Sequence, residues 1–275
     1  MFNTLAEIFS YEFMQNALLA GVLVSLVSGI IGTLVVLNRM VGISGGVAHA
    51  AYGGVGIASY FGFDPVLGAV LFSLLSSVTM GVAHRKLRER SDTMIGVMWA
   101  VGMAIGIIFV SLTPGYRANL MSYLFGSILA VSMADIWWMA GIAAATVLFV
   151  ALFYRQLLAI SFDEEFATVR NLPVTVLSVF LLIMTGLTVV VAMRVVGLIM
   201  VIALLTIPSA IVSMFFKDLR VIMLVAVGLG IVLIWAGLVI SFLSNLPAAA
   251  VIILLAGIAY FLAFVIKRIL LKTKI

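Results

Sequence analysis

The sequence predicts an all-α membrane protein that crosses the bilayer about nine times, with eight to ten crossings compatible with the pattern. Two observations predict this class. Of the 275 residues, 65% are hydrophobic and only 9% are charged, and the mean hydropathy is +1.37. A soluble domain carries about 25% charged residues and could not bury so much apolar surface. Because the chain has no Cys, disulfides and thiolate sites are excluded.

Nine apolar runs account for the predicted spans. A span needs about 20 mostly apolar residues, and the runs are bounded by charges, Pro, or clusters of Asn and Gly. The second run is short for a span and could be tilted, broken or partly re-entrant. The runs cover residues 16–37, 47–61, 66–83, 93–112, 136–153, 174–193, 197–216, 221–243 and 247–266.

The Lys and Arg residues predict the orientation, because they are retained on the cytoplasmic side during insertion. With the N-terminus outside and the C-terminus in the cytoplasm, nine spans leave only Arg117 and Arg194 outside, and the other 13 of the 15 basic residues lie inside. The basic balance therefore indicates orientation in the cell membrane, and not nucleic-acid binding. Residues 1–15 contain Glu7 and Glu12 but no Lys or Arg, and we expect them at the outer interface, ahead of a transmembrane domain over residues 16–275.

The most polar stretch, residues 160–173, predicts a short cytoplasmic helix over about residues 161–171. Ser161 followed by Glu164 fits a capping box, and acidic residues suit the first turn of a helix. Asn171 can adopt the left-handed conformation at the helix end, and Pro173 prevents continuation. An ordinary solvated loop is the alternative interpretation.

An internal match suggests a repeat. Residues 36–43, VLNRMVGI, resemble residues 191–198, VAMRVVGL, at an offset of 155 residues. Five spans separate the equivalent positions, so the halves 16–112 and 174–266, of four spans each, would point in opposite directions across the bilayer. Inverted repeats are typical of transporters, with the substrate path between the halves near the midplane. Chance similarity among apolar letters is the alternative.

Small residues predict close helix packing in two places. Ser25 with Gly29, Ser28 with Gly32, and Gly42 with Gly46 are pairs spaced four apart, which lets helices approach closely. Packing explains most glycines of the Gly-rich stretch 41–57 better than a ligand role does.

His49 is the candidate functional residue of that stretch. An ionisable side chain inside an apolar run is costly to bury and is a functional candidate for that reason, although a His bonded to a backbone carbonyl near the interface would look the same. His84 begins the basic segment HRKLRER and is interpreted as a solvated flank. The sequence has no HExxH, GxSxG or Walker A motif, so catalysis and ATP hydrolysis by this chain are not supported.

The 10 acidic residues all fall at the ends of the predicted spans or in loops. A proton- or sodium-coupled carrier usually needs buried carboxylates, so an autonomous carrier is disfavoured. Asp64, Asp135, Glu7 and Glu12 make the outer face mildly acidic, which favours a cation as substrate.

Four segments in order give the chain a resemblance to a known family, the membrane permeases of ATP-binding-cassette importers for zinc, manganese and iron(II). The segments are FMQNALLAGVLVSLVSGIIGTLVVLNRMVGISGGVAHA (13–50), FDEEFATVRNLPV (162–174), VGLIMVIALLTIPSAIVSMFFKDLR (196–220) and NLPAAAVIILLAG (245–257). The resemblance implies a homodimeric pore or a pair of related permeases, a separate cytoplasmic ATPase, and an extracytoplasmic metal-binding protein. The metal would be the substrate, with no permanently bound cofactor.

The resemblance also implies roles for particular residues. The second segment looks like the part that docks into the ATPase, through Phe162, Asp163, Glu164, Glu165, Arg170, Asn171 and Pro173. His49 matches a metal gate of the family, which often has an acidic residue four positions earlier, where this chain has Gly45. Ser44, Tyr52, backbone carbonyls or a second His49 could complete the coordination. Rival interpretations are a permease for iron chelates or cobalamin, an autonomous secondary carrier or channel, and, more remotely, an intramembrane enzyme.

Overall fold

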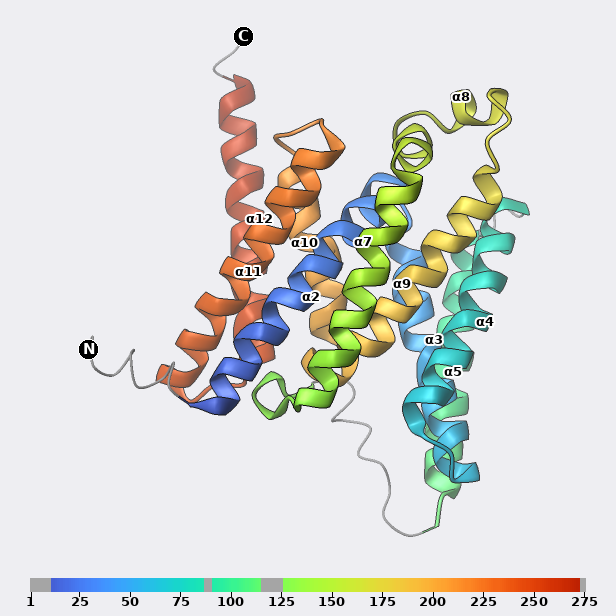
Figure 1. The fold of residues 1–275 in the computed structure, drawn as a ribbon, viewed down its shortest axis with the longest axis vertical. Helices are drawn as coiled ribbons and strands as arrows, with labels where there is room; N and C mark the ends of the chain where they lie inside the picture. Colours follow the sequence, from blue (N-terminus) through green and yellow to red (C-terminus); the bar gives the residue numbers. More distant parts are fainter. Residues whose placement is uncertain (1–10, 87–90, 115–125, 273–275) are drawn as a thin grey trace. The chain divides into compact units, whose positions relative to one another are not determined.

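A computed structural model describes residues 11–86, 91–114 and 126–272, and these ranges contain helices and no strand (Figure 1). The predicted all-α class is confirmed, and each of the nine apolar runs overlaps one helix, although the run 197–216 extends three residues past the end of α10 at Ser213. A backbone surrounded by lipid must satisfy its own hydrogen bonds, which a helix does. The long helices are α2 (Glu12–Leu37), α3 (Val41–Phe61), α4 (Pro65–Lys86), α5 (Ser91–Leu112), α7 (Met133–Phe162), α9 (Val174–Val196), α10 (Leu198–Ser213), α11 (Leu219–Ser244) and α12 (Ala248–Lys272). Two short elements are η2 (Ile128–Ala130) and α8 (Glu164–Val169).

Seven of these helices have both the length and the hydropathy of a membrane span, so the chain is a multi-pass membrane protein. The other two in the described ranges are α10, which has 16 residues, and α3. Six glycines and His49 lower the hydropathy of α3, although its 21 residues are long enough to span. The second run was therefore predicted too short: the helix begins at Val41, six residues earlier.

Helix α7 also differs from its predicted run, which ended at residue 153. The helix continues to Phe162 past a kink at Phe153, where φ is −108° and ψ is 16°. Charges such as Arg155 limit the part that lipid can surround, but they remove no backbone hydrogen bond. The end of an apolar run is thus the end of a span and not necessarily of a helix.

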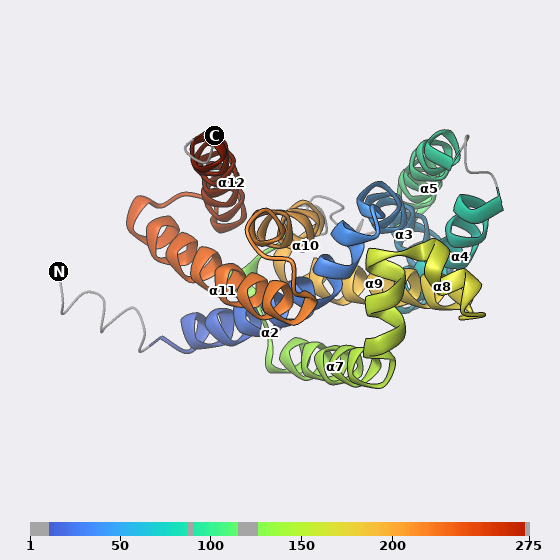
Figure 2. The same ribbon diagram turned by 90° about the horizontal axis from the view of Figure 1, so that it is seen from above.

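The chain forms two compact units. Unit 1 contains residues 1–33, 122–147 and 192–275, and unit 2 contains residues 34–121 and 148–191. In unit 1, α10, α11 and α12 pack against one another, and in unit 2, α3 packs against α4 and α5 (Figure 2). The units cut across the predicted halves 16–112 and 174–266, because most of α2 belongs to unit 1 and most of α9 to unit 2.

The starts of these two helix trios recur at the offset of 155 residues. Shifted by that offset, the starts of α3, α4 and α5 fall at residues 196, 220 and 246, and α10, α11 and α12 begin at Leu198, Leu219 and Ala248. Each pair agrees within two residues. The inverted orientation of the halves stays a prediction.

Glycines bring helix backbones together as predicted. In unit 2, a Cβ on Gly54 would overlap the carbonyl of Gly68 on α4, and one on Gly56 would overlap Gly106 on α5. In unit 1, Gly29 of α2 packs on Val227, whose backbone nitrogen would lie 2.7 Å from an added Cβ. Gly42 is the exception, because none of the described residues lies within 4 Å of its Cβ position, so they give its predicted packing role no support.

The outer surfaces of the helices are apolar. On α12, for example, Leu254, Phe261 and Leu262 are each more than half exposed. Side chains of this kind facing outward on a long helix are suited to contact with lipid tails.

Candidate metal site and coupling helix

His49 lies in the middle of α3, and its imidazole stacks face to face on the indole of Trp99 from α5. The ring centroids are 4.1 Å apart and the planes differ by 12°. The Nδ1 atom of His49 is buried and has no hydrogen-bond partner in the described part of the chain. A buried polar atom without a partner needs an explanation, and a ligand that binds transiently is one.

Two glycines, Gly45 and Gly46, precede His49 on α3 and have apolar neighbours. Gly45 lies one turn earlier on α3, and a Cβ built there would be 3.8 Å from Cζ3 of Trp99. Gly46 faces Ile95 and the thioether of Met80. Among the described residues, no group of three or more His, Asp or Glu side chains could hold a metal ion. One chain therefore offers a single imidazole here.

The side chains considered as further ligands also make contacts within the chain. The Ser44 hydroxyl donates to the carbonyl of Val41 at 2.8 Å. Tyr52 is fully buried and makes interactions of its own. Because α3 is helical from Val41 to Phe61, the carbonyls beside its glycines take part in a regular helix. A second imidazole from another copy of the chain remains compatible with this geometry.

His84 differs from its predicted place on a solvated flank. It is partly buried near the end of α4, and its Nδ1 also lacks a hydrogen-bond partner among the described residues. The sequence located the helix end but not the packing around it.

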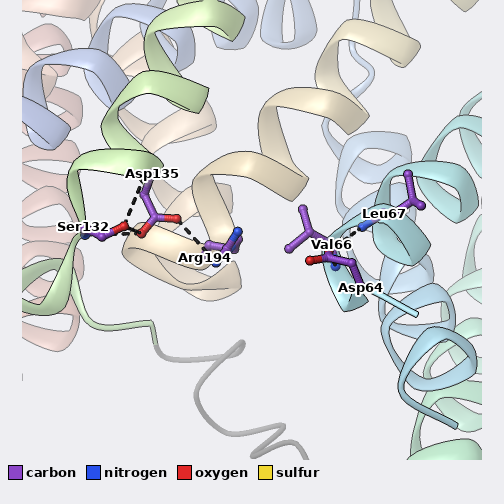
Figure 3. A network of polar contacts seen from close by, with 6 residues as sticks. All are labelled: Asp64, Val66, Leu67, Ser132, Asp135 and Arg194. Atoms are coloured by element: carbon purple, nitrogen blue, oxygen red, sulfur yellow. Dashed lines mark hydrogen bonds and ion pairs between the residues drawn. The ribbon is translucent and has the colours of Figure 1, made fainter. Parts of the chain in front are cut away.

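The described carboxylates all lie at helix ends, as predicted. Asp64 caps α4 by accepting hydrogen bonds from the backbone nitrogens of Val66 and Leu67, and Asp135 accepts one from the Ser132 hydroxyl (Figure 3). Within unit 1, Asp135 also pairs with Arg194 at 3.6 Å. The remaining described acids are Glu12, Asp92, Asp163, Glu164, Glu165 and Asp218, in the first turns or caps of their helices. Glu7, Glu89 and Arg117 lie outside the described residues.

A second candidate region is the short helix α8, whose cap differs from the predicted one. The Asp163 carboxylate accepts a hydrogen bond from the backbone nitrogen of Phe166 at 2.8 Å, so Asp163 is the N-cap. The predicted capping box at Ser161 is wrong. Ser161 belongs to the last turn of α7, and its hydroxyl accepts a hydrogen bond from the Asn38 amide at 2.9 Å.

The predicted left-handed Asn171 is confirmed, but α8 covers Glu164–Val169 and is shorter at both ends than the predicted residues 161–171. Arg170 follows the last helical residue, and its guanidinium lies 5.1 Å from the centre of the Phe166 ring. Asn171 takes the left-handed conformation with φ of 56°, which an Asn tolerates better than most residues. Pro173 then immediately precedes α9.

The α8 segment has one buried and one exposed face. Ala167 is fully buried in a cluster with Ile160, Val174 and Leu177. Phe162, Phe166 and Val169 are exposed, the last to 81%, beside the exposed acid Glu165. An exposed apolar face with acidic neighbours, held in place by a buried alanine, is suited to docking against another protein.

Comparison with known proteins decides the family. A model of the ABC 3 transport family matches residues 10–267. The chain belongs to this family. The family resemblance seen in the sequence is thereby confirmed, and it covers nearly the whole chain.

Relatives of this ABC 3 transport protein match it over most of their length. A membrane protein of Synechocystis is 52% identical over 98% of this chain and 95% of its own. The manganese transport system membrane protein of Listeria monocytogenes is 34% identical over 94% of this chain and 92% of its own. The solved structure of PsaBC from Streptococcus pneumoniae in complex with Fab has a chain that is 29% identical, with a TM-score of 0.85, covering 96% of this chain and 95% of that one.

Two features of this ABC 3 transport protein were missed by the sequence reasoning. Part of the exposed face of α8 could have been found, because Phe166 and Val169 are spaced three apart, as on one side of a helix, whereas Phe162 belongs to α7 and is separated from α8 by the extended Asp163. The stacking of Trp99 on His49 had no signal, since the two residues are 50 positions apart on different helices.

Proposed function

We propose that this chain is the membrane permease of an ATP-driven importer that carries a divalent transition metal, zinc, manganese or iron(II), into the cytoplasm. The observation that carries the proposal is His49, an ionisable side chain with a buried, unpartnered nitrogen in the middle of a helix of a family member. His84 also has an unpartnered nitrogen, but it lies near the end of α4. Imidazole nitrogen suits ions of this borderline class. The name of the Listeria relative, which is 34% identical over nearly its full length, supports manganese as one candidate.

The energy would come from a separate cytoplasmic ATPase that docks on α8. Phe162, Phe166 and Val169 would supply the apolar contact, and the acids Asp163, Glu164 and Glu165 would meet basic groups of the partner. Arg170, Asn171 and Pro173 would fix the link to α9, so that movement of the partner is transmitted to that helix. The N-terminus would lie outside, where a metal-binding protein delivers the ion, and a second permease copy would complete the pore.

The experiment is reconstitution of the chain with its ATPase and metal-binding protein in vesicles. ATP hydrolysis and metal uptake are measured with the binding protein loaded separately with zinc, manganese or iron(II). Stimulation by one of these ions supports the proposal, whereas stimulation only by an iron chelate or cobalamin would assign the chain to a different substrate class. Metal flux through the chain alone, without the ATPase, would identify an autonomous carrier and contradict the proposal.

Two histidine variants test the site. His49→Ala should lose metal uptake while the chain still inserts in the membrane and co-purifies with the ATPase. His84→Ala is the matched control, because it removes the other histidine, and it should keep uptake. Wild-type uptake by the His49 variant would remove this residue from the ion path.

A further inference from the structure

The stacked pair of His49 and Trp99 restricts how an ion can bind to the imidazole. The ring planes are nearly parallel with their centres 4.1 Å apart, so the planes are separated by no more than that distance. The indole is larger than the imidazole, so it covers one face of that ring and extends past part of its edge. An ion bound in the imidazole plane at that edge has one side covered.

A covered face leaves no room for a full shell of water. An octahedral ion such as Mg²⁺ holds its ligands at about 2.0–2.1 Å, so a water above the imidazole plane would lie about 2 Å from the indole plane. Contact between heavy atoms requires about 3.5 Å. An ion at His49 must give up a ligand on that side, and Mg²⁺ loses water reluctantly, whereas Zn²⁺ commonly binds with four ligands.

The position of Trp99 does not serve helix packing alone. Its side chain is 38% exposed, so it is not part of a closed core. The contact between α3 and α5 is instead close where Gly53 meets Gly102 and Gly56 meets Gly106. Gly45 lies beside the indole, and a Cβ built there would make an ordinary van der Waals contact with the ring at 3.8 Å.

We propose that Trp99 is a specificity-determining residue, whose indole covers the His49 imidazole and rejects ions that retain a full hydration shell. The inference rests on the proposed function, because it assigns the ion path to His49. The property that is selected is the ease with which an ion loses part of its water shell, and Mg²⁺ is the ion that is excluded.

The test is competition between Mn²⁺ and Mg²⁺ for the full chain in detergent, with free Mn²⁺ counted by its electron paramagnetic resonance signal. In the wild type, a hundredfold excess of Mg²⁺ should displace little Mn²⁺. Trp99→Ala should be displaced at about tenfold lower Mg²⁺, and Trp99→Phe, which keeps an aromatic cover, should stay within about threefold of wild type. Trp235→Ala, which removes an exposed tryptophan of unit 1, is the matched control and should behave as wild type.

Each other outcome contradicts the inference in a distinguishable way. If Trp99→Ala discriminates as well as wild type, Trp99 does not select, although the proposed function stands. If Trp99→Ala loses Mn²⁺ binding altogether, as His49→Ala should, the indole positions the imidazole and does not select. If wild-type Mn²⁺ binding does not depend on His49, the inference fails; if, in addition, the complex in vesicles takes up no metal, the proposed function fails too.

Discussion

Helix α3 of unit 2 and helix α10 of unit 1 are packed in different ways. The two helices hold matching positions, because α10 begins two residues after the start of α3 shifted by 155 residues. Helix α3 has six glycines and meets the backbones of α4 and α5 directly. Helix α10 has no glycine; it packs with α11 and α12, and its backbone at Leu205 closely approaches Gly32 of α2. Two helices at matching positions can thus make close backbone contacts through their own glycines or through a glycine of a neighbouring helix.

The difference extends to the candidate site. At the offset of 155 residues, His49 corresponds to Leu204, Gly45 to Met200 and Trp99 to Leu254. Leu204 and Met200 are each 1% exposed, so α10 has apolar core residues where α3 has the polar site. A recurring helix arrangement does not imply a recurring site, because one copy can serve stability while the other binds.

The largest expected effects come from substitutions at the two matching positions, His49 and Leu204. His49→Leu should abolish metal uptake without lowering stability, because it removes a polar atom that lacks a partner. Leu204→Ala should cost about 2–5 kcal/mol by leaving a cavity, while the complexes that still fold keep their uptake. Uptake per assembled complex and thermal unfolding in detergent measure the two effects. Loss of uptake in both variants would show that α10 also contributes to the path.

Adding a single carbon to α3 should give the next largest effect. A Cβ at Gly56 would overlap the backbone of Gly106, so Gly56→Ala should force α3 and α5 apart at a cost of about 3 kcal/mol. Gly42→Ala is the control on the same helix, since no described residue lies within 4 Å of its Cβ position, and it should stabilise by up to about 1 kcal/mol. The stability of both variants is measured as the fraction of protein that stays monodisperse after heating. Equal stability of the two variants would contradict backbone contact as the basis of packing in unit 2.

The aspartate caps compare the units at a smaller scale. Asp163 caps the six residues of α8 in unit 2, and Asp218 caps the 26 residues of α11 in unit 1. Replacing either by Ala should cost about 1 kcal/mol. Because α8 has less than two turns, Asp163→Ala should unfold it and reduce ATPase docking. Asp218→Ala should only fray the first turn of the longer helix α11. Amide hydrogen exchange at residues 164–169 and 219–222 would report this, with Ser161→Ala as a control that leaves α8 protected.

The smallest effects are expected at the two arginines of the matching segments. Arg194 pairs with Asp135 at a partly exposed site, so Arg194→Ala should cost less than about 1 kcal/mol, and high salt should remove the difference. Arg39 has φ of 57°, and Arg39→Gly should stabilise by about 1 kcal/mol by relieving the left-handed conformation. Thermal unfolding at low and high salt separates the two. A salt-independent loss of several kcal/mol at Arg194 would mean that the pair has a structural role beyond an exposed ion pair.

Much of the fold could be predicted from hydropathy, and helix ends were the weaker part. The nine runs overlap nine helices because apolar length and the absence of charge are local properties. The extension of α3 to Val41 and of α7 to Phe162 was missed, since glycine and charge interrupt an apolar pattern without breaking a helix. Similarly, α8 was expected but its cap was assigned to Ser161, whose hydroxyl in fact contacts Asn38, far away in the sequence.

The sequence by itself determined that this is a helical membrane protein of a transport family, where its spans lie, that carboxylates are confined to their ends, and that His49 is an unusual side chain within them. These follow from composition and from the energy of placing each residue type in lipid, which depend on little besides the residue and its neighbours. The tertiary structure alone decided that Trp99 covers His49 and which glycines meet a backbone. It also decided that the first helix of each predicted half, α2 or α9, belongs mostly to the unit that contains the other helices of the opposite half. Contacts of this kind join different helices, and their partners are set by how whole helices pack, which no local pattern encodes.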